Sequence, residues 1–182
     1  YGYFAGGYYF PGSPFYRSTV DRLDFSSETV SSGNNLSQVN GYLEGVSASD
    51  YGYFGGGASA YSVIDRLDFS NGTIISPGNN LPQGRQQLST VSSLSYGYFA
   101  GGLAPSPTNS VSTVDRIDFS NETTSAPGNN LSVVRYDIGD NTFTLNYGYF
   151  AGGYNSALTP SGTKYDIIAV SYTHLRAHEN NS

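Results

Sequence analysis

Tyr51-Gly52-Tyr53-Phe54-Gly55-Gly56-Gly57 is one of four near-identical copies of an aromatic motif that decides the fold of this chain. The other copies have Ala at the fifth position and begin at Tyr1, Tyr96 and Tyr147. Aromatic residues followed by a glycine pair are typical of a short strand that enters a close-packed turn. Because the motif recurs about every 45–50 residues, the sequence predicts a repeat array.

Two further motifs recur in the same order between the aromatic copies. Val/Ile-Asp-Arg-Leu/Ile-Asp-Phe-Ser begins at Val20, Ile64 and Val114, and Ser/Pro-Gly-Asn-Asn-Leu begins at Ser32, Pro77 and Pro127. We therefore divide the chain into repeat 1 (residues 1–50), repeat 2 (51–95), repeat 3 (96–146) and a partial repeat 4 (147–169). In the partial repeat the second motif is degenerate, and it reads Tyr165-Asp166-Ile167-Ile168.

Each repeat is predicted to form four short strands. The aromatic motif and the second motif give two of them, since both are rich in β-branched and aromatic residues. Asn71-Gly72 then predicts a hairpin turn into a third strand at residues 73–75. Residues 81–90 and 131–138 are candidates for the fourth strand. No repeat shows helical periodicity, so we expect an all-β fold.

Composition agrees with a folded β-rich chain and excludes several function classes. The 182 residues are 37% hydrophobic, with 23 Gly and 17 Tyr but only 12% charged residues. A net charge of −6 with scattered arginines argues against nucleic acid as a partner. No apolar run is long enough for membrane insertion. Cysteine is absent, which excludes zinc–thiolate sites and thiol nucleophiles, and we expect no cofactor.

Carboxylate pairs are the only feature that points to acid–base or metal chemistry. They flank an arginine in each complete second motif: Asp21, Arg22 and Asp24; Asp65, Arg66 and Asp68; Asp115, Arg116 and Asp118. A catalytic pair should occur once, in two differently tuned environments, whereas these pairs occur in every complete repeat. We therefore predict a structural role, with the arginines neutralising the carboxylates. Calcium coordination is the alternative.

Tyrosines are the other candidate site residues. Those of the aromatic motif are expected to pack between repeats, although an aromatic lining for sugar rings is an alternative. The segments after each glycine pair vary in length and sequence, and variable loops on a constant frame are where recognition usually lies. The sequence therefore predicts ligand contacts at Tyr8, Tyr9, Tyr16, Tyr61 and Tyr154.

The glycine pairs, the second motif and a later Leu and Arg together resemble the Kelch repeat. The glycine pairs are Gly6-Gly7, Gly56-Gly57, Gly101-Gly102 and Gly152-Gly153, and the later residues are Leu81 with Arg85 and Leu131 with Arg135. The usual Kelch tryptophan is absent, and Asn40 stands where the later repeats have arginine. The resemblance implies a Kelch-like β-propeller fragment of about three and a half four-stranded blades. Neighbouring blades would then lie outside it, which would leave apolar faces and strand edges exposed.

Two further resemblances concern the origin of the chain. The aromatic motif is similar to repetitive proteins of marine metagenomes and phage virions, in which a tail-fibre role is suspected. Residues 170–179 resemble a translated sequencing adapter, so residues 170–182 are expected to be a non-native tail. Both histidines, His174 and His178, lie in that tail.

The functional expectation is a non-catalytic binding, adhesion or structural module on a virion or cell surface. Its partner would be a glycan or a protein surface contacted by the blade loops. The alternative is a fragment of a propeller-based glycan-active hydrolase, with catalytic residues partly in further blades.

Overall fold

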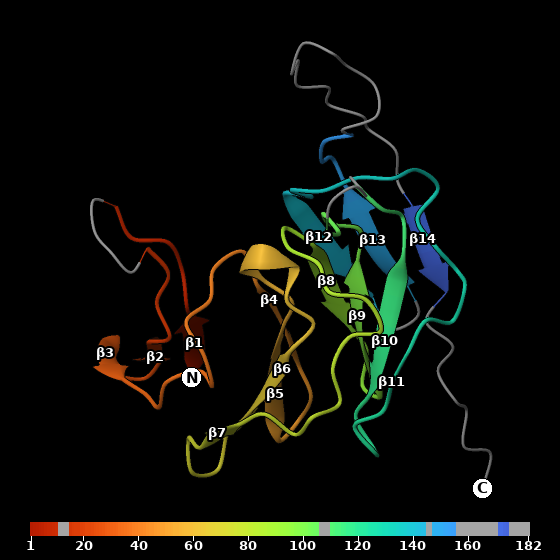
Figure 1. The fold of residues 1–182 in the computed structure, drawn as a ribbon. Coiled ribbons are helices and arrows are strands. Elements are labelled where there is room, and N and C mark those ends of the chain that lie inside the picture. Colours follow the sequence, from red (N-terminus) through yellow and green to blue (C-terminus); the bar gives the residue numbers. More distant parts are fainter. Residues whose placement is uncertain (11–14, 106–109, 145–146, 156–170, 175–182) are drawn as a thin grey trace, which may run out of the picture.

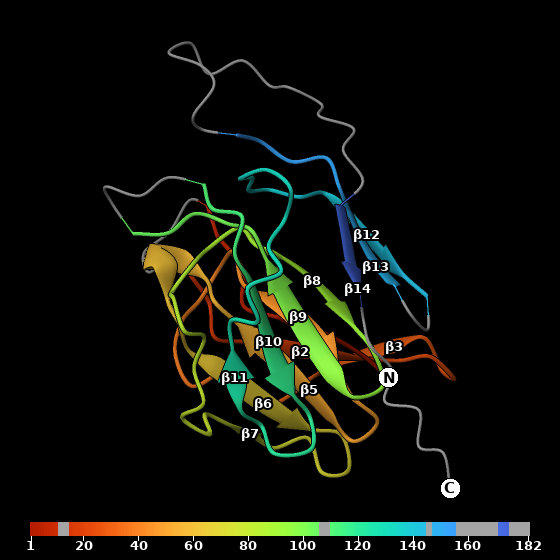
Figure 2. The same ribbon diagram turned by 90° about the vertical axis from the view of Figure 1, so that its right-hand side faces the viewer.

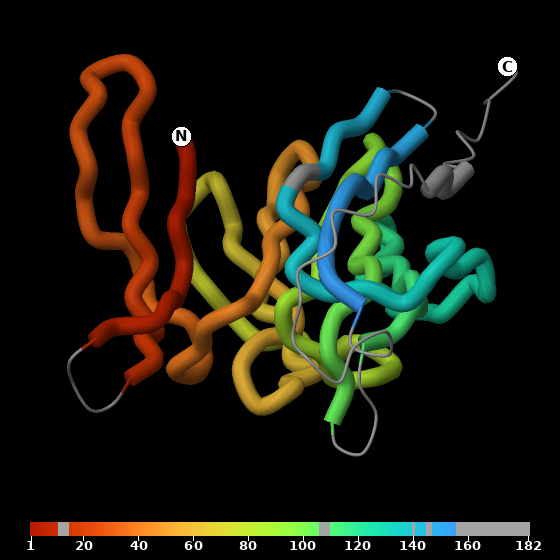
Figure 3. The backbone as a smooth tube through the Cα atoms, turned by 90° about the horizontal axis from the view of Figure 1, so that it is seen from above, coloured from red at the N-terminus to blue at the C-terminus, as the bar shows by residue number. Residues whose placement is uncertain are grey.

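A computed structural model describes residues 1–10, 15–105, 110–144, 147–155 and 171–174 (Figure 1). In this part of the chain the fold is all-β, as the sequence predicts. Four antiparallel sheets follow one another in chain order, from red to blue in Figure 3. One 3-10 turn, η1 (Ala58–Ala60), interrupts the strands.

The strands of each sheet are consecutive in the chain. The first sheet has the order β1 (Gly2–Ala5), β2 (Val20–Asp24), β3 (Thr29–Ser32), and the second β4 (Glu44–Ser47), β5 (Tyr51–Gly55), β6 (Ile64–Asp68), β7 (Ile74–Ile75). The third has β8 (Ser89–Ser92), β9 (Tyr96–Ala100), β10 (Val114–Asp118), β11 (Thr124–Ser125), and the fourth β12 (Asp140–Phe143), β13 (Tyr147–Ala151), β14 (Ser171–His174).

The three predicted motif structures are found where the sequence puts them. The aromatic motif forms β1, β5, β9 and β13, and the second motif forms β2, β6 and β10. The tight turn after β6 is closed by a hydrogen bond from Gly72 N to Asp68 O of 2.8 Å. Gly72 has a φ of 74°, and Glu28 and Glu122 occupy the same turn position with φ of 56° and 59°. A left-handed residue at this position is what the Asn-Gly sequence predicts.

The fourth strand lies further along the chain than the sequence predicts, at β8 and β12. Residues 81–88 instead form a loop, in which Leu81 and Leu88 are buried against the sheets. Moreover, β8 pairs with β9 of the next repeat, just as β4 pairs with β5. Each four-stranded sheet therefore takes its first strand from one repeat and three strands from the next, so neighbouring repeats share a sheet.

These first strands, β4, β8 and β12, lie beside one another, and we call them the inner strands. The Thr90 hydroxyl donates to Gly45 O at 2.8 Å, and Asn141 Nδ2 donates to the Ser89 hydroxyl at 3.1 Å. The described sheets form an open row around the inner strands and do not close into a ring (Figure 3). Figure 2 shows the third sheet, β8–β11, in face view.

The fourth sheet differs from the others because the described strand that follows its aromatic strand does not come from a second motif. Strand β14 pairs with β13, Tyr147 opposite His174, and lies in the segment expected to be a non-native tail. The degenerate motif at residues 165–168 falls outside the described residues. No helix in the described part of the chain is long and apolar enough to span a membrane.

Two hydrophobic clusters fill the spaces between the sheets, and each is centred on the phenylalanine of an aromatic motif. Phe99 packs with Val46, Tyr53 and neighbouring residues between the second and third sheets. Phe150 packs with Val91, Tyr98 and neighbouring residues between the third and fourth. Each phenylalanine thus points at the preceding sheet. Phe4 occupies the same motif position in the first sheet and is 63% exposed, whereas Phe99 is fully buried.

Because of this difference, the same substitution should lower the free energy of unfolding by different amounts at the two equivalent positions. Phe99→Ala should lower the free energy of unfolding by about 3–5 kcal/mol because it leaves a cavity between two sheets. Phe4→Ala should change it by less than about 1 kcal/mol, as for an exposed side chain. Urea denaturation of the two variants measures both values, and equal costs would contradict the assignment of Phe99 to the core.

Candidate functional site

Stacked aromatic rings join the first sheet to the second and the second sheet to the third. The second tyrosine of the aromatic motif stacks on the phenylalanine of the second motif in the next repeat. Tyr3 and Phe69 have ring centroids 5.6 Å apart, and Tyr53 and Phe119 have centroids 5.4 Å apart, with interplanar angles of 15° and 10°. Tyr53 is fully buried. These motif tyrosines therefore serve packing between repeats, which was the expected reading.

Glu122 adds a polar contact to the same interface. The Tyr53 hydroxyl donates to Glu122 Oε1 at 3.1 Å, and Arg66 Nη1 donates to that oxygen at 2.7 Å. Burial, and then the neighbouring Glu122 carboxylate, raise the pKa of Tyr53 well above its ordinary value. A hydroxyl held neutral in this way acts as a hydrogen-bond donor between sheets and not as a base.

The arginines of the second motif contact tyrosines instead of neutralising the flanking carboxylates. Each guanidinium lies over the first tyrosine of the aromatic motif, 4.5–4.6 Å from the ring centroid: Arg22 over Tyr1, Arg66 over Tyr51 and Arg116 over Tyr96. Cation–π contacts of this geometry stabilise neighbouring strands within one sheet.

The buried carboxylate of the third sheet is instead neutralised by an arginine of the preceding repeat. Arg85 Nη2 donates to Asp115 Oδ2 at 2.5 Å, and both side chains are fully buried. Arg85 also donates to the carbonyl oxygens of Gly101 at 2.9 Å, Thr113 at 2.7 Å and Phe99 at 3.3 Å. Burial raises the pKa of Asp115 and lowers that of Arg85, against their mutual attraction. This pair is a junction between repeats.

The same junction is built differently in the other repeats. Arg135 Nη1 donates to Gly152 O at 3.2 Å, as Arg85 does to Gly101. At the first junction Asn40 takes this position: its Nδ2 donates to Gly56 O at 2.8 Å and its Oδ1 accepts from Ala58 N at 3.0 Å. The amide thus satisfies the same glycine carbonyl without a charge. Asp65, the counterpart of Asp115, accepts a hydrogen bond from Ser37 N at 2.9 Å.

The second carboxylate of each pair closes the turn after its strand. Asp24, Asp68 and Asp118 each accept hydrogen bonds from the hydroxyl and amide of the serine two residues on, at 2.6–2.9 Å. The serine hydroxyl, followed by the amide, lowers the pKa of Asp24 and of Asp68. Within the described residues no three His, Cys, Asp or Glu side chains group closely enough to hold a metal ion. Asp21 is exposed on the first sheet.

The structure does bring together three of the predicted ligand tyrosines. Tyr8 stacks on Phe15 at 5.9 Å and meets Tyr16 edge-on at 5.8 Å, while Tyr16 meets Tyr42 at 6.1 Å. Arg17 lies 4.6 Å from the centroid of the Tyr9 ring. We call this set the aromatic loop cluster: Tyr8, Tyr9, Phe15, Tyr16, Arg17 and Tyr42. Its backbone is held by a bridge between Tyr8 and Tyr16 and a 2.7 Å hydrogen bond from Tyr9 N to Phe15 O.

The cluster is open to solvent. Tyr8 is 52% and Tyr9 49% exposed, and Phe15 and Tyr42 are exposed to a similar degree. Sequence reasoning missed Phe15, Arg17 and Tyr42. Phe15 and Arg17 lie within or next to the variable segment, which was a usable signal. Tyr42 comes from the end of repeat 1 and joins only through folding.

The other two predicted tyrosines lie in equivalent loops of later repeats but outside this cluster. Tyr61 follows η1, which lies at the upper end of the sheets in Figure 1, and its N–H donates to Gly57 O at 3.1 Å. Tyr154 follows β13 and stacks on Tyr136, with centroids 5.6 Å apart. Tyr61 and Tyr154 therefore lie in two separate loops. In the described part of the chain the five predicted tyrosines do not form one common binding site.

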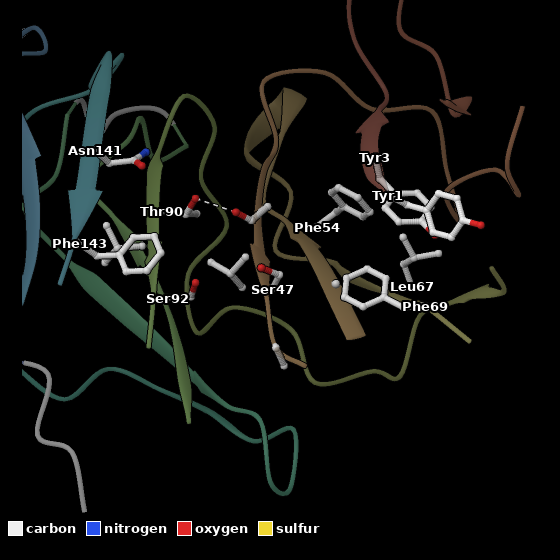
Figure 4. Close-up of a pocket in the computed structure, with 15 residues that line it drawn as sticks. Tyr1, Tyr3, Ser47, Phe54, Leu67, Phe69, Thr90, Ser92, Asn141 and Phe143 are labelled. Atoms are coloured by element: carbon white, nitrogen blue, oxygen red, sulfur yellow. Dashed lines mark hydrogen bonds between the residues drawn. The ribbon is translucent and has the colours of Figure 1, made fainter. Parts of the chain in front are cut away.

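A cavity of about 480 Å³ lies along β4, and none of the five predicted ligand tyrosines lines it (Figure 4). Tyr3 of β1 and Tyr1, which precedes that strand, lie at one end together with Phe69. Thr90 of β8 and Asn141 of β12 lie at the other end. The cavity thus runs from an aromatic wall to the hydroxyl and amide groups of the inner strands.

Breaking the buried ion pair should be costly. Arg85→Met leaves Asp115 charged and without its guanidinium partner, and should lower the free energy of unfolding by about 3–5 kcal/mol. Arg22→Met, at a partly exposed arginine, should cost about 1 kcal/mol or less. The double variant Arg85→Met/Asp115→Asn should recover part of the loss, and urea denaturation measures the coupling. Strictly additive losses would contradict a direct Arg85–Asp115 interaction.

Tyr53 should make the fold sensitive to alkali. Its pKa is raised in the folded state, so between the ordinary tyrosine value of about 10 and the folded value only the unfolded chain loses the proton. The free energy of unfolding should therefore fall as the pH rises above about 10. In Tyr53→Phe this decline should be shallower, and chemical denaturation from pH 8 to 11 checks it. An unchanged slope would refute the prediction. Some slope should remain because burial also raises the pKa of Tyr98.

No protein-family model matches the chain, and no curated protein is significantly similar to it.

Proposed function

We propose that the chain is a non-catalytic recognition module, built from blades of a Kelch-like β-propeller, that binds a glycan through the loops following the glycine pairs. The observation that carries this proposal is the exposed aromatic loop cluster, set on a frame whose repeated polar residues are engaged in packing. The resemblance to repetitive virion proteins fits an adhesion role on a particle or cell surface.

The propeller arrangement is supported by the way the sheets neighbour one another. The inner strands lie side by side, and each sheet packs its face against the next through equivalent residues. Propellers arrange four-stranded sheets in this radial manner around a central axis. In this arrangement the loops after the glycine pairs share one end of the molecule, the upper end in Figure 1.

Glycan recognition is supported by the chemistry of the cluster. Rings of Tyr8, Tyr9 and Phe15 are exposed yet held by neighbouring rings and backbone hydrogen bonds, so little side-chain entropy is lost on binding. The negative face of an aromatic ring favours the C–H face of a pyranose. Tyrosine hydroxyls and the Arg17 guanidinium can bond sugar hydroxyls.

The hydrolase alternative gains no support from the described residues. Asp65 and Asp115 are buried at junctions between repeats, and Asp68 and Asp118 close turns. Carboxylates engaged in this way do not face a shared substrate position. We therefore place the functional surface at the loops.

The proposal is tested with the full chain on a glycan array. The wild-type chain should bind a defined set of glycans, and Tyr8→Ala/Tyr9→Ala should weaken that binding at least about tenfold, or about 1.4 kcal/mol. Phe25→Ala is the matched control, because Phe25 is 66% exposed but lies at the far end of β2. It should bind as the wild type does.

Circular dichroism of all three proteins shows whether the fold is retained. No glycan binding by the folded wild-type chain, or full binding by the double variant, would overturn the proposal. Binding to a protein surface in place of any glycan would likewise reject the ligand class.

A further inference from the structure

Asp65 is a buried carboxylate without the guanidinium partner that its counterpart has. It is only 4% exposed, and among the described residues its side chain receives one hydrogen bond, from Ser37 N to Oδ2 at 2.9 Å. Its Oδ1 atom is buried and has no hydrogen-bond partner in the described part of the chain. Asp115 also has one buried oxygen of this kind, but Arg85 balances its charge. A buried carboxylate needs such a compensating charge because burial removes the water that would stabilise it.

Asn40 takes the arginine position at this junction, but its side chain does not reach the carboxylate. The main-chain oxygens of Asn40, Arg85 and Arg135 each accept a 2.8 Å hydrogen bond from the second glycine of their own repeat, so the three side chains start from equivalent places. The Asn40 amide ends at the next glycine pair, where a Cβ added to Gly57 would overlap its Oδ1 atom. Within the described residues no hydrogen bond joins Asn40 to Asp65.

The contacts of Arg85 show which oxygens surround this position. Besides its carboxylate partner, Arg85 donates to three main-chain carbonyl oxygens of the third sheet. By position in the repeat, their counterparts in the second sheet are the carbonyl oxygens of Phe54, Gly56 and Val63. Asn40 donates to Gly56 O. Two main-chain oxygens and the Asp65 carboxylate are therefore grouped where a guanidinium lies in the third sheet.

This set of ligands suits a small monovalent metal ion. All the groups are oxygens, which alkali and alkaline-earth cations prefer. A single carboxylate balances one positive charge, and the described residues contain no group of three acidic side chains that would favour calcium. Arg66 follows Asp65 directly, but neighbouring strand residues point to opposite faces, and Arg66 pairs with Glu122.

We propose that Asp65 Oδ1 and the carbonyl oxygens of Phe54 and Val63 bind a monovalent metal cation such as sodium. The ion neutralises Asp65 and does at this junction what the Arg85 guanidinium does at the next one. The junction between repeats 1 and 2 therefore depends on the salt around the protein. The junction between repeats 2 and 3 carries its own positive charge.

Urea denaturation of the full chain in different chloride salts tests the proposal. Sodium chloride and potassium chloride are compared with choline chloride at equal ionic strength, because equal ionic strength keeps charge screening constant and choline is too large for the site. The alkali cations should stabilise the fold in a saturable way. At a free concentration about ten times the dissociation constant, the better of the two should lower the equilibrium constant of unfolding about tenfold.

Matched variants locate the site. Asp65→Asn should remove the difference between the alkali salts and choline chloride. Asp21→Asn is the control, because Asp21 has the same motif position in the first sheet but is exposed, and this variant should keep the difference. Asn40→Arg supplies the guanidinium that Arg85 supplies elsewhere, and should also make stability independent of the alkali cation. Circular dichroism shows which variants fold, and Asp65→Asn alone is decisive if Asn40→Arg does not.

Sodium-23 NMR gives a readout that does not depend on stability. The folded chain should broaden the sodium resonance, and Asp65→Asn should reduce the broadening whereas Asp21→Asn should not. Equal stability of the wild-type chain in alkali and choline salts, or an undiminished cation effect in folded Asp65→Asn, would overturn the proposal. Stabilisation by calcium chloride but by neither alkali salt would also overturn it. The Tyr8→Ala/Tyr9→Ala chain should respond to sodium as the wild type does, so this result is independent of glycan recognition.

Discussion

Sharing of a strand between consecutive repeats is the constraint on which the rest of this structure depends. Because β4 and β8 end one repeat and pair with the aromatic strand of the next, no four-stranded sheet belongs to a single repeat. A sheet formed in this way holds two repeats by main-chain hydrogen bonds, which are insensitive to side-chain identity. Because each repeat contributes one such strand, the chain forms one sheet per repeat.

Side chains then fix the angle and contact of neighbouring sheets. Phe99 is inserted against the preceding sheet, Tyr53 stacks on the following one, and Arg85 joins Asp115 across the junction. These contacts are made by residues that recur in the sequence. The recurring carboxylates and tyrosines therefore stabilise the packing of the sheets. The loops after the glycine pairs vary in sequence while the frame is constant, and this variation permits an exposed cluster such as Tyr8 with Phe15.

Local features of the sequence were sufficient to predict most strands and turns. The aromatic motif and the Asn71-Gly72 turn are encoded by residues next to one another, and they form as expected. The fourth strand could not be placed because Leu81 and Leu88 have the hydrophobicity of a strand but are buried in a loop. The pairing of Arg85 with Asp115 and of Tyr42 with Tyr16 depends on contacts between distant residues. The sequence pattern carries no distance information for such contacts. Asn40, which departs from the arginine of the later repeats, lies at a junction that is built differently.

The offset between repeat and sheet also affects how such a chain can change in length. Deletion or duplication of one whole repeat removes or adds the last three strands of one sheet together with the first strand of the next. The flanking β4-type and β5-type strands can then pair with each other directly, because every copy has the same register. Arrays of this kind can therefore gain or lose units by recombination between the near-identical motifs without leaving an unmatched strand in their interior.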